Sequence, residues 1–196
     1  QVEHPVTELV CNIDLVKAQL EIAYSNKIPI DQDDIKQKGH AIEIRVCSED
    51  PSRNFAPSTG KIEELVLPKL DDVRYDFGIQ KKQTISTDFD SMVGKLICFG
   101  PSRKNAISKC EAALKQIVIL GIETNLNFVN YIIQTERFKS GKLSTNFIKD
   151  EKDRITQIEK ENQNSFHAVA LAAIIEGDVM RDKLLEPYAS IGPWRN

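Results

Sequence analysis

The sequence predicts an α+β fold: a mostly antiparallel sheet with flanking helices, followed by a helical tail. Three observations lead to this prediction. Residues 40–46 alternate in the manner of a half-buried strand, residues 91–99 form a second strongly apolar segment, and residues 103–120 repeat apolar side chains at helical spacing. Because strands and helices are interleaved through short connections, an antiparallel arrangement is favoured.

The composition is that of an ordinary globular chain. Of the 196 residues, 41% are hydrophobic and 28% are charged, and this length can bury a sizeable core. The net charge of −3 provides no basic excess, so we expect no general nucleic-acid surface. No apolar run reaches transmembrane length, so we expect no membrane partner.

The cysteines argue against a zinc site and against a disulfide framework. Cys11, Cys47, Cys98 and Cys110 include no C-x-x-C pair. We therefore predict no metal site in this chain, and we expect buried reduced thiols in a reducing compartment.

At the N-terminus, Pro5 argues against a helix interior, and residues 1–8 are predicted to be a strand end leading into a turn. Asp14 is suited to cap a helix over residues 15–23, in a region that Pro29 ends. Residues 31–38 are predicted to be a charged connector with a short turn of helix.

The first strong strand covers residues 40–46. Ile42, Ile44 and Val46 share one face, so Glu43 and Arg45 are predicted to project together from the other face, away from the core. The loop signals that follow, Pro51, Pro57 and Gly60, lie within residues 48–60.

The remaining elements follow in order along the chain. Strands are predicted over residues 61–67, 73–77 and 91–99. Ser102 is predicted to cap a helix from Arg103 to about Leu120 that Gly121 ends, and Asn125 to start a helix through Phe138 that Gly141 closes.

A change in composition after Phe147 divides the chain. A charge run at residues 149–154 precedes a long helix predicted over residues 155–175. We therefore predict one domain over residues 1–150 and a helical linker with the start of a following domain over residues 151–196.

Six segments, in order, resemble biotin carboxylases, the ATP-grasp enzymes that carboxylate biotin. They are QVEHPVTE at 1–8, GHAIEIRVCSEDP at 39–51, FAPSTGKI at 55–62, DFDSMVGKLICFG at 88–100, GIETN at 121–125 and STNFI at 144–148. The resemblance implies the C-terminal part of a biotin carboxylase, as in the α subunit of an acetyl-, propionyl- or methylcrotonyl-CoA carboxylase. It implies residues 1–150 as that domain, starting with the end of the ATP-grasp region.

The resemblance implies roles for four residues. Glu3 would be the base that takes the proton of bicarbonate, a role that suits a carboxylate within hydrogen-bond reach. Gln1 and Val2 would bind bicarbonate through an amide and a backbone N–H. Arg45 would stabilise the oxyanion of deprotonated biotin. On their own, Glu3 fits a surface carboxylate, and Arg45 fits a strand arginine paired with a neighbouring acid.

Three further positions match family landmarks. Asp90 would lie near the biotin pocket, Phe147 would lie against the adenine of ATP, and Arg74 falls where the family places a dimer-interface residue. The plainer alternatives are a turn aspartate for Asp90 and a core aromatic for Phe147. The neighbours of Arg74 depart from the family pattern.

The resemblance also implies cofactors and partners. The full-length enzyme would use ATP with Mg²⁺ or Mn²⁺, and biotin would be attached to a separate carrier domain. The family's metal carboxylates, glycine-rich loop and ATP lysines lie upstream of QVEHPVTE. We therefore expect this chain to begin inside an active site and, alone, to hydrolyse no ATP and carry no biotin.

The implied partners are a biotin carboxyl carrier domain, a carboxyltransferase subunit or domain, and further copies of the same chain. The implied location is the bacterial cytoplasm or the mitochondrial matrix. Three alternatives remain open: a non-catalytic scaffold or interaction domain, the biotin carboxylase part of a pyruvate or urea carboxylase, and another ATP-grasp ligase such as half of a carbamoyl-phosphate synthetase.

Overall fold

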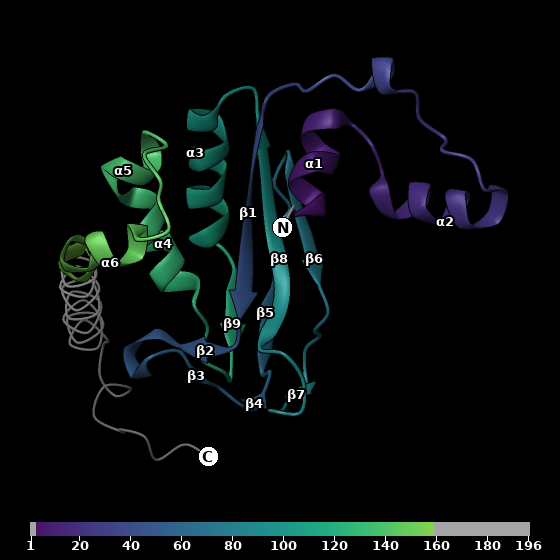
Figure 1. The fold of residues 1–196 in the computed structure, drawn as a ribbon. Coiled ribbons are helices and arrows are strands. Elements are labelled where there is room, and N and C mark those ends of the chain that lie inside the picture. The colour runs from purple at the N-terminus through teal and green to yellow at the C-terminus, as the bar shows by residue number, and fades with distance from the viewer. Residues whose placement is uncertain (1–2, 159–196) are drawn as a thin grey trace, which may run out of the picture. The chain divides into compact units, whose positions relative to one another are not determined.

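The computed structural model describes residues 3–158. The chain divides into two compact units, residues 1–145 and residues 146–196. An antiparallel sheet of three strands forms the centre of the first unit (Figure 1). The predicted α+β class with antiparallel pairing and flanking helices is confirmed.

In this central sheet, the strand order is β1-β8-β6. The bounds are His40–Cys47 for β1, Met92–Gly100 for β8 and Val73–Phe77 for β6, so the predicted strands at these places are confirmed. The register sets Arg45 opposite Lys95 and Lys95 opposite Asp76. Directly opposed residues point to the same side of a sheet, so these three charged residues form a row across one face.

The other face of the sheet is apolar and packs against α3 (Arg103–Leu114). Ser102 caps this helix as predicted, because its side-chain oxygen accepts a hydrogen bond from the backbone N–H of Asn105. The buried cluster between helix and sheet includes residues from β1, β8 and α3, among them Ile42, Ile44, Val46, Leu96, Cys98, Ala106, Cys110 and Ala113.

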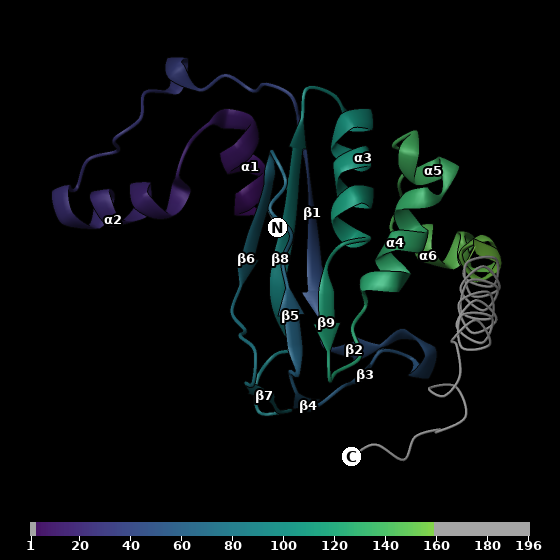
Figure 2. The same cartoon turned by 180° about the vertical axis from the view of Figure 1, so that it is seen from behind.

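The charged face lies under α1 (His4–Cys11), and Figures 1 and 2 show α1 and α3 on opposite sides of the sheet. The prediction of a strand end over residues 1–8 is therefore wrong. Pro5 lies in the first turn of α1, where the absent N–H would have no partner within the helix in any case. A proline there starts a helix rather than preventing one.

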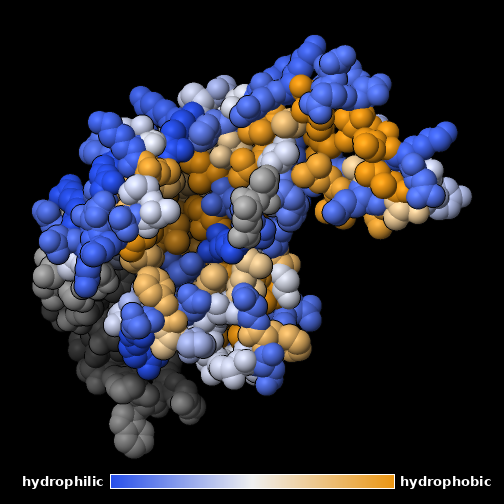
Figure 3. Space-filling model, viewed as in Figure 1, coloured by the Kyte–Doolittle hydropathy of each residue, from blue (hydrophilic) through white to orange (hydrophobic). Residues whose placement is uncertain are grey.

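The next helix, α2 (Leu15–Ser25), is capped as predicted: Asp14 Oδ1 accepts a hydrogen bond from Lys17 N at 2.8 Å. It ends at Asn26, which is in the left-handed conformation, and so before Pro29. A short 3₁₀ turn, η1 (Gln32–Asp34), follows in the predicted connector. Figure 3 shows apolar side chains gathered over this region, and Ala18 is the one buried residue of α2.

Short strand pairs surround the lower end of the sheet in Figure 1. The predicted loop at residues 48–60 contains two-residue strands and a 3₁₀ turn, and the predicted strand at residues 61–67 is shorter. The elements are β2 (Glu49–Asp50) with β3 (Ala56–Pro57), η2 (Pro51–Arg53), β4 (Gly60–Lys61) with β7 (Thr84–Ile85), and β5 (Glu64–Val66) with β9 (Val118–Leu120).

Helix α3 ends at Leu114, so the predicted end near Leu120 is wrong. The apolar residues that follow belong to β9, which pairs with β5 instead of continuing the helix. Gly121 comes after this strand rather than after the helix. Its φ is +106°, and a Cβ there would lie 1.9 Å from the carbonyl oxygen of Lys61, so a side chain is excluded.

The predicted helix from Asn125 to Phe138 is split at Thr135 into α4 (Leu126–Gln134) and α5 (Glu136–Lys139). Thr135 is extended, and its hydroxyl accepts a hydrogen bond from Phe138 N at 3.3 Å, so it caps the second helix.

In the second unit, α6 (Phe147–Asp150) is followed by helical residues 152–158. The rest of the helix predicted over residues 155–175 lies outside the described residues. Within the described part of the chain, no helix has the length and apolar character needed to cross a membrane.

Candidate functional site

The structure brings Glu3 and Arg45 together. Glu3 is the N-cap residue of α1, and its carboxylate lies over the charged face of the sheet. One oxygen accepts a hydrogen bond from Nη2 of Arg45, and the other accepts one from Nζ of Lys95 at 2.9 Å. An acid and two cations from three segments therefore meet in one cluster.

Local structure explains this meeting. The alternation of β1 places Arg45 on the face away from α3, and the antiparallel register places Lys95 of β8 directly beside it. Helix α1 contacts both strands, so the residue at its start lies above them. Chain direction and strand register together bring residues 3, 45 and 95 to one point.

Lys95 belongs to the cluster but is not among the site residues predicted from the sequence. It is a charged residue inside an otherwise apolar strand, and its side chain is only 14% exposed. A charged side chain is seldom buried without a partner, so its place in the apolar segment 91–99 was the available signal. Identifying the partner required the strand register.

A second acid completes the cluster. The side chain of Glu43 is 4% exposed, and its Oε1 lies 3.1 Å from Nζ of Lys95. Among the described residues, neither of its oxygens has a well-aligned hydrogen bond. Glu43 does point away from the α3 core as predicted, but it is covered rather than open to solvent.

The two acids have opposite electrostatic environments. The hydrogen bond from Lys95, with a further one from Arg45, lowers the pKa of Glu3 to about 2. Burial raises the pKa of Glu43 above its ordinary value, and the negative charge of Glu3 adds to that effect. Glu3 is therefore an anion at neutral pH and a weak proton acceptor while both cations hold it.

None of the other predicted site residues is placed in this cluster by the structure. Gln1 and Val2 are outside the described residues. Asp90 Oδ1 accepts a hydrogen bond from Met92 N at 2.8 Å, as a turn residue at the start of β8 would. Phe147 belongs to the second unit, where it is 7% exposed, and its contact with adenine stays a prediction.

Arg74 is engaged within the chain. Its guanidinium donates to Glu8 Oε2 at 2.6 Å and to Asp76 Oδ1 at 2.8 Å. The side chain of Glu8 is 6% exposed, so this ion pair links α1 to β6. The predicted interface role of Arg74 stays a prediction.

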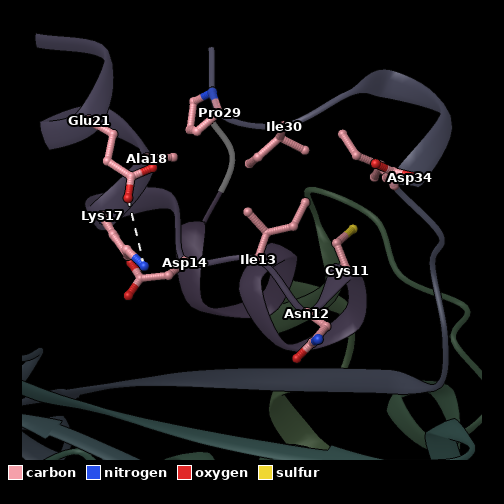
Figure 4. A pocket seen from close by; sticks show the side chains of 11 residues that line it. Cys11, Asn12, Ile13, Asp14, Lys17, Ala18, Glu21, Pro29, Ile30 and Asp34 are labelled. Atoms are coloured by element: carbon pink, nitrogen blue, oxygen red, sulfur yellow. Dashed lines mark hydrogen bonds and ion pairs between the residues drawn. The ribbon is translucent and has the colours of Figure 1, made fainter. Parts of the chain in front are cut away.

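An open hollow lies elsewhere in the first unit, between the end of α1, α2 and residues 29–35 (Figure 4). Its charged lining includes Lys17 and Glu21, which form an exposed ion pair at 3.7 Å. It contains none of the site residues predicted from the sequence. In the described part of the chain, no group of three or more His, Cys, Asp or Glu side chains could hold a metal ion.

The fold and the cluster define an α+β domain in which two acids and two cations meet on one face of the sheet. Residues 43–150 match the family model described as "Biotin carboxylase C-terminal domain". The chain therefore belongs to the biotin carboxylase family, and the resemblance seen in its sequence is confirmed.

Relatives and solved structures agree with this assignment. The chain is 42% identical over 149 residues to Biotin carboxylase 2 of Bacillus subtilis, covering 76% of this chain and 33% of that protein. It is 30% identical over 200 residues to the mitochondrial methylcrotonoyl-CoA carboxylase subunit alpha of Dictyostelium discoideum, covering 100% of this chain and 29% of that protein.

Among solved structures, the biotin carboxylase domain of the Hydrogenobacter thermophilus 2-oxoglutarate carboxylase, in complex with MgADP, ADP and bicarbonate, superposes with a TM-score of 0.76. It is 34% identical, and the match covers 79% of this chain and 34% of that one. The chain thus spans about a third of the length of these relatives.

Proposed function

We propose that this chain is the C-terminal part of a biotin carboxylase, which uses ATP and bicarbonate to carboxylate biotin on a carrier. The observation that carries the proposal is the convergence of Glu3, Arg45 and Lys95 in one cluster of the family's fold. The solved relative in complex with MgADP and bicarbonate supports the substrate assignment.

Glu3 takes the proton of bicarbonate in this proposal. Its carboxylate is held by two cations, and releasing one of them increases its basicity. Arg45 is the cation able to leave, because its side chain is 48% exposed while that of Lys95 is 14% exposed. The arrival of substrate anions at Arg45 therefore prepares Glu3 as a base.

Arg45 has a second role in this proposal, the stabilisation of the biotin oxyanion. Loss of the ureido proton leaves negative charge on the biotin oxygen, and the guanidinium that has left Glu3 stabilises the charge that develops there. Gln1 and Val2 bind bicarbonate, Asp90 lies near biotin and Phe147 lies against adenine in the same proposal.

ATP supplies the phosphoryl group that activates bicarbonate. In this proposal Mg²⁺ or Mn²⁺ accompanies the ATP. The residues that bind the metal and the phosphates of ATP would belong to the N-terminal part of the longer protein, so this chain alone would hydrolyse no ATP.

The partners follow from the same proposal: a biotin carboxyl carrier domain, a carboxyltransferase, and a second copy of the enzyme. The final acceptor is an acyl-CoA, as the name of the Dictyostelium relative suggests, with pyruvate or urea as alternatives. The compartment would be the bacterial cytoplasm or the mitochondrial matrix. The intact Glu3–Arg45 pair disfavours a scaffold that has lost its chemistry.

The test is a substitution of Glu3 in the longer protein that contains the N-terminal part found in its relatives. Glu3→Gln keeps the size and removes the base, so the rate of bicarbonate-dependent biotin carboxylation should fall by roughly a hundredfold or more. Glu21→Gln, on the exposed surface of α2, is the matched control and should leave the rate unchanged. Full activity of the Glu3 variant would remove this residue from the mechanism.

A further inference from the structure

Lys95 has two acidic partners, and one of them is buried. Its Nζ lies 2.9 Å from Glu3 Oε2 and 3.1 Å from Glu43 Oε1. An ammonium group has three donors and can serve both acids at once. We propose that Lys95 is a positioning residue for the base Glu3, and that Glu43 anchors Lys95 in place; this inference rests on the proposed function.

The burial of Glu43 is the first argument. A carboxylate that is 4% exposed is costly to keep charged, and its one ion-pair contact among the described residues is Lys95. A lysine needed only to pair with Glu3 would require no buried acid behind it. The pair of Lys82 and Glu63, by comparison, is exposed on both sides, at 59% and 54%.

The order of exposure is the second argument. It rises from Glu43 at 4%, through Lys95 at 14% and Glu3 at 30%, to Arg45 at 48%. Glu3, the proposed base, is therefore held by Lys95 on its buried side and by Arg45 on its exposed side. The more buried Lys95 is the fixed cation, and the more exposed Arg45 is the movable one. Fixing a reacting group in one orientation is a recognised source of rate enhancement.

The third argument is that Lys95 pairs with two acids, Glu3 and Glu43, so that its positive charge is shared between them. Within residues 3–158, the charged groups facing Lys95 are Glu3 from the start of α1, Glu43 and Arg45 from β1, and Asp76, which lies opposite Lys95 on β6. Asp76 is occupied by Arg74. Lys95 is thus available to Glu3 and Glu43, and removing the charge of Glu43 would strengthen its hold on Glu3 and weaken the base.

The experiment uses the longer, active protein and two substitutions of Lys95. Lys95→Ala removes the ammonium and leaves space, whereas Lys95→Met removes the ammonium and fills the space. Both should lower kcat for biotin carboxylation by roughly tenfold to a hundredfold with little change in the KM for bicarbonate. Added n-propylamine should restore most of the lost rate, saturably, in the alanine variant alone.

Two outcomes would overturn the inference: wild-type rates in both variants, or a loss in Lys95→Ala that n-propylamine does not restore. If Lys95→Ala does not fold, Lys95→Met combined with Glu43→Gln avoids leaving a bare buried acid. It should be at least several-fold slower than Glu43→Gln alone, and equal rates would overturn the inference. An inactive wild-type protein would instead contradict the proposed function.

Discussion

The two faces of the central sheet are made by the same three strands but are held together differently. On the α3 face, Leu96 and Cys98 are fully buried among apolar neighbours. On the α1 face, Lys95 and Arg45 meet acids from α1 and β1. Lys95 and Leu96 are adjacent in sequence, so a single step along β8 leads from the charged cluster to the apolar core.

The two faces are therefore expected to contribute differently, one mainly to the stability of the fold and the other mainly to chemistry. An apolar face depends on volume and excluded water, and its contribution is insensitive to pH. A charged face depends on each acid having its cation, and it changes with protonation. We therefore expect substitutions on the α3 face to act mainly on folding, and those on the α1 face to act mainly on catalysis and on pH dependence.

The largest effect on stability is expected on the α3 face. Leu96→Ala removes a fully buried side chain from the core and should lower the free energy of unfolding by about 3 kcal/mol. Urea unfolding followed by circular dichroism measures this. Leu20→Ala, at a residue of α2 that is 68% exposed, is the control and should change stability by less than about 0.5 kcal/mol. Equal losses would contradict the placement of the core.

A smaller effect, with a defined pH window, is expected on the α1 face. The pKa of Glu3 is lowered from 4.5 to about 2, so its ion pairs stabilise the fold above the unfolded value. That stability is lost as pH falls through the folded value, which places the loss between about pH 5 and pH 2. The Glu3→Gln variant lacks these ion pairs. Its free energy of unfolding should therefore fall less than that of the wild type as the pH is lowered through this range.

The comparison with Glu3→Gln matters because other groups titrate in the same range. Glu63 and Glu64 also have lowered pKa values, from the hydrogen bonds of Lys82 and Lys81, and both are present in wild type and variant alike. The raised pKa of Glu43 acts in the opposite direction. Parallel pH curves for the two proteins would contradict the ion pairs assigned to Glu3.

The strands and their faces could be predicted because alternation is a local property. Ile42, Ile44 and Val46 point into the α3 core, and Arg45 points out, as the spacing indicates. Two helix boundaries could not be predicted this way. Pro5 predicts the absence of a helix, yet it lies in the first turn of α1. Residues 118–120 continue the apolar pattern of α3 but form a strand, because they pair with β5.

The candidate site also contains residues that could be predicted from the sequence and residues that could not. Glu3 and Arg45 were found through resemblance to a family, and the structure places them in contact. The face of Glu43 could be predicted, but its pairing with Lys95 could not, because that pairing depends on the strand register and on the burial of both side chains. Sequence patterns indicate which face a side chain takes, but only the assembled sheet shows which charges meet there.

The most direct test of the central claim, that the α1 face of the sheet carries the chemistry, is the biotin carboxylation rate of Arg45→Gln in the longer protein. Loss of a guanidinium that stabilises the biotin oxyanion should lower kcat by roughly a hundredfold. Arg53→Gln, at an arginine that is 70% exposed and paired with Asp50, should retain the wild-type rate. Equal rates for the two variants would contradict the account.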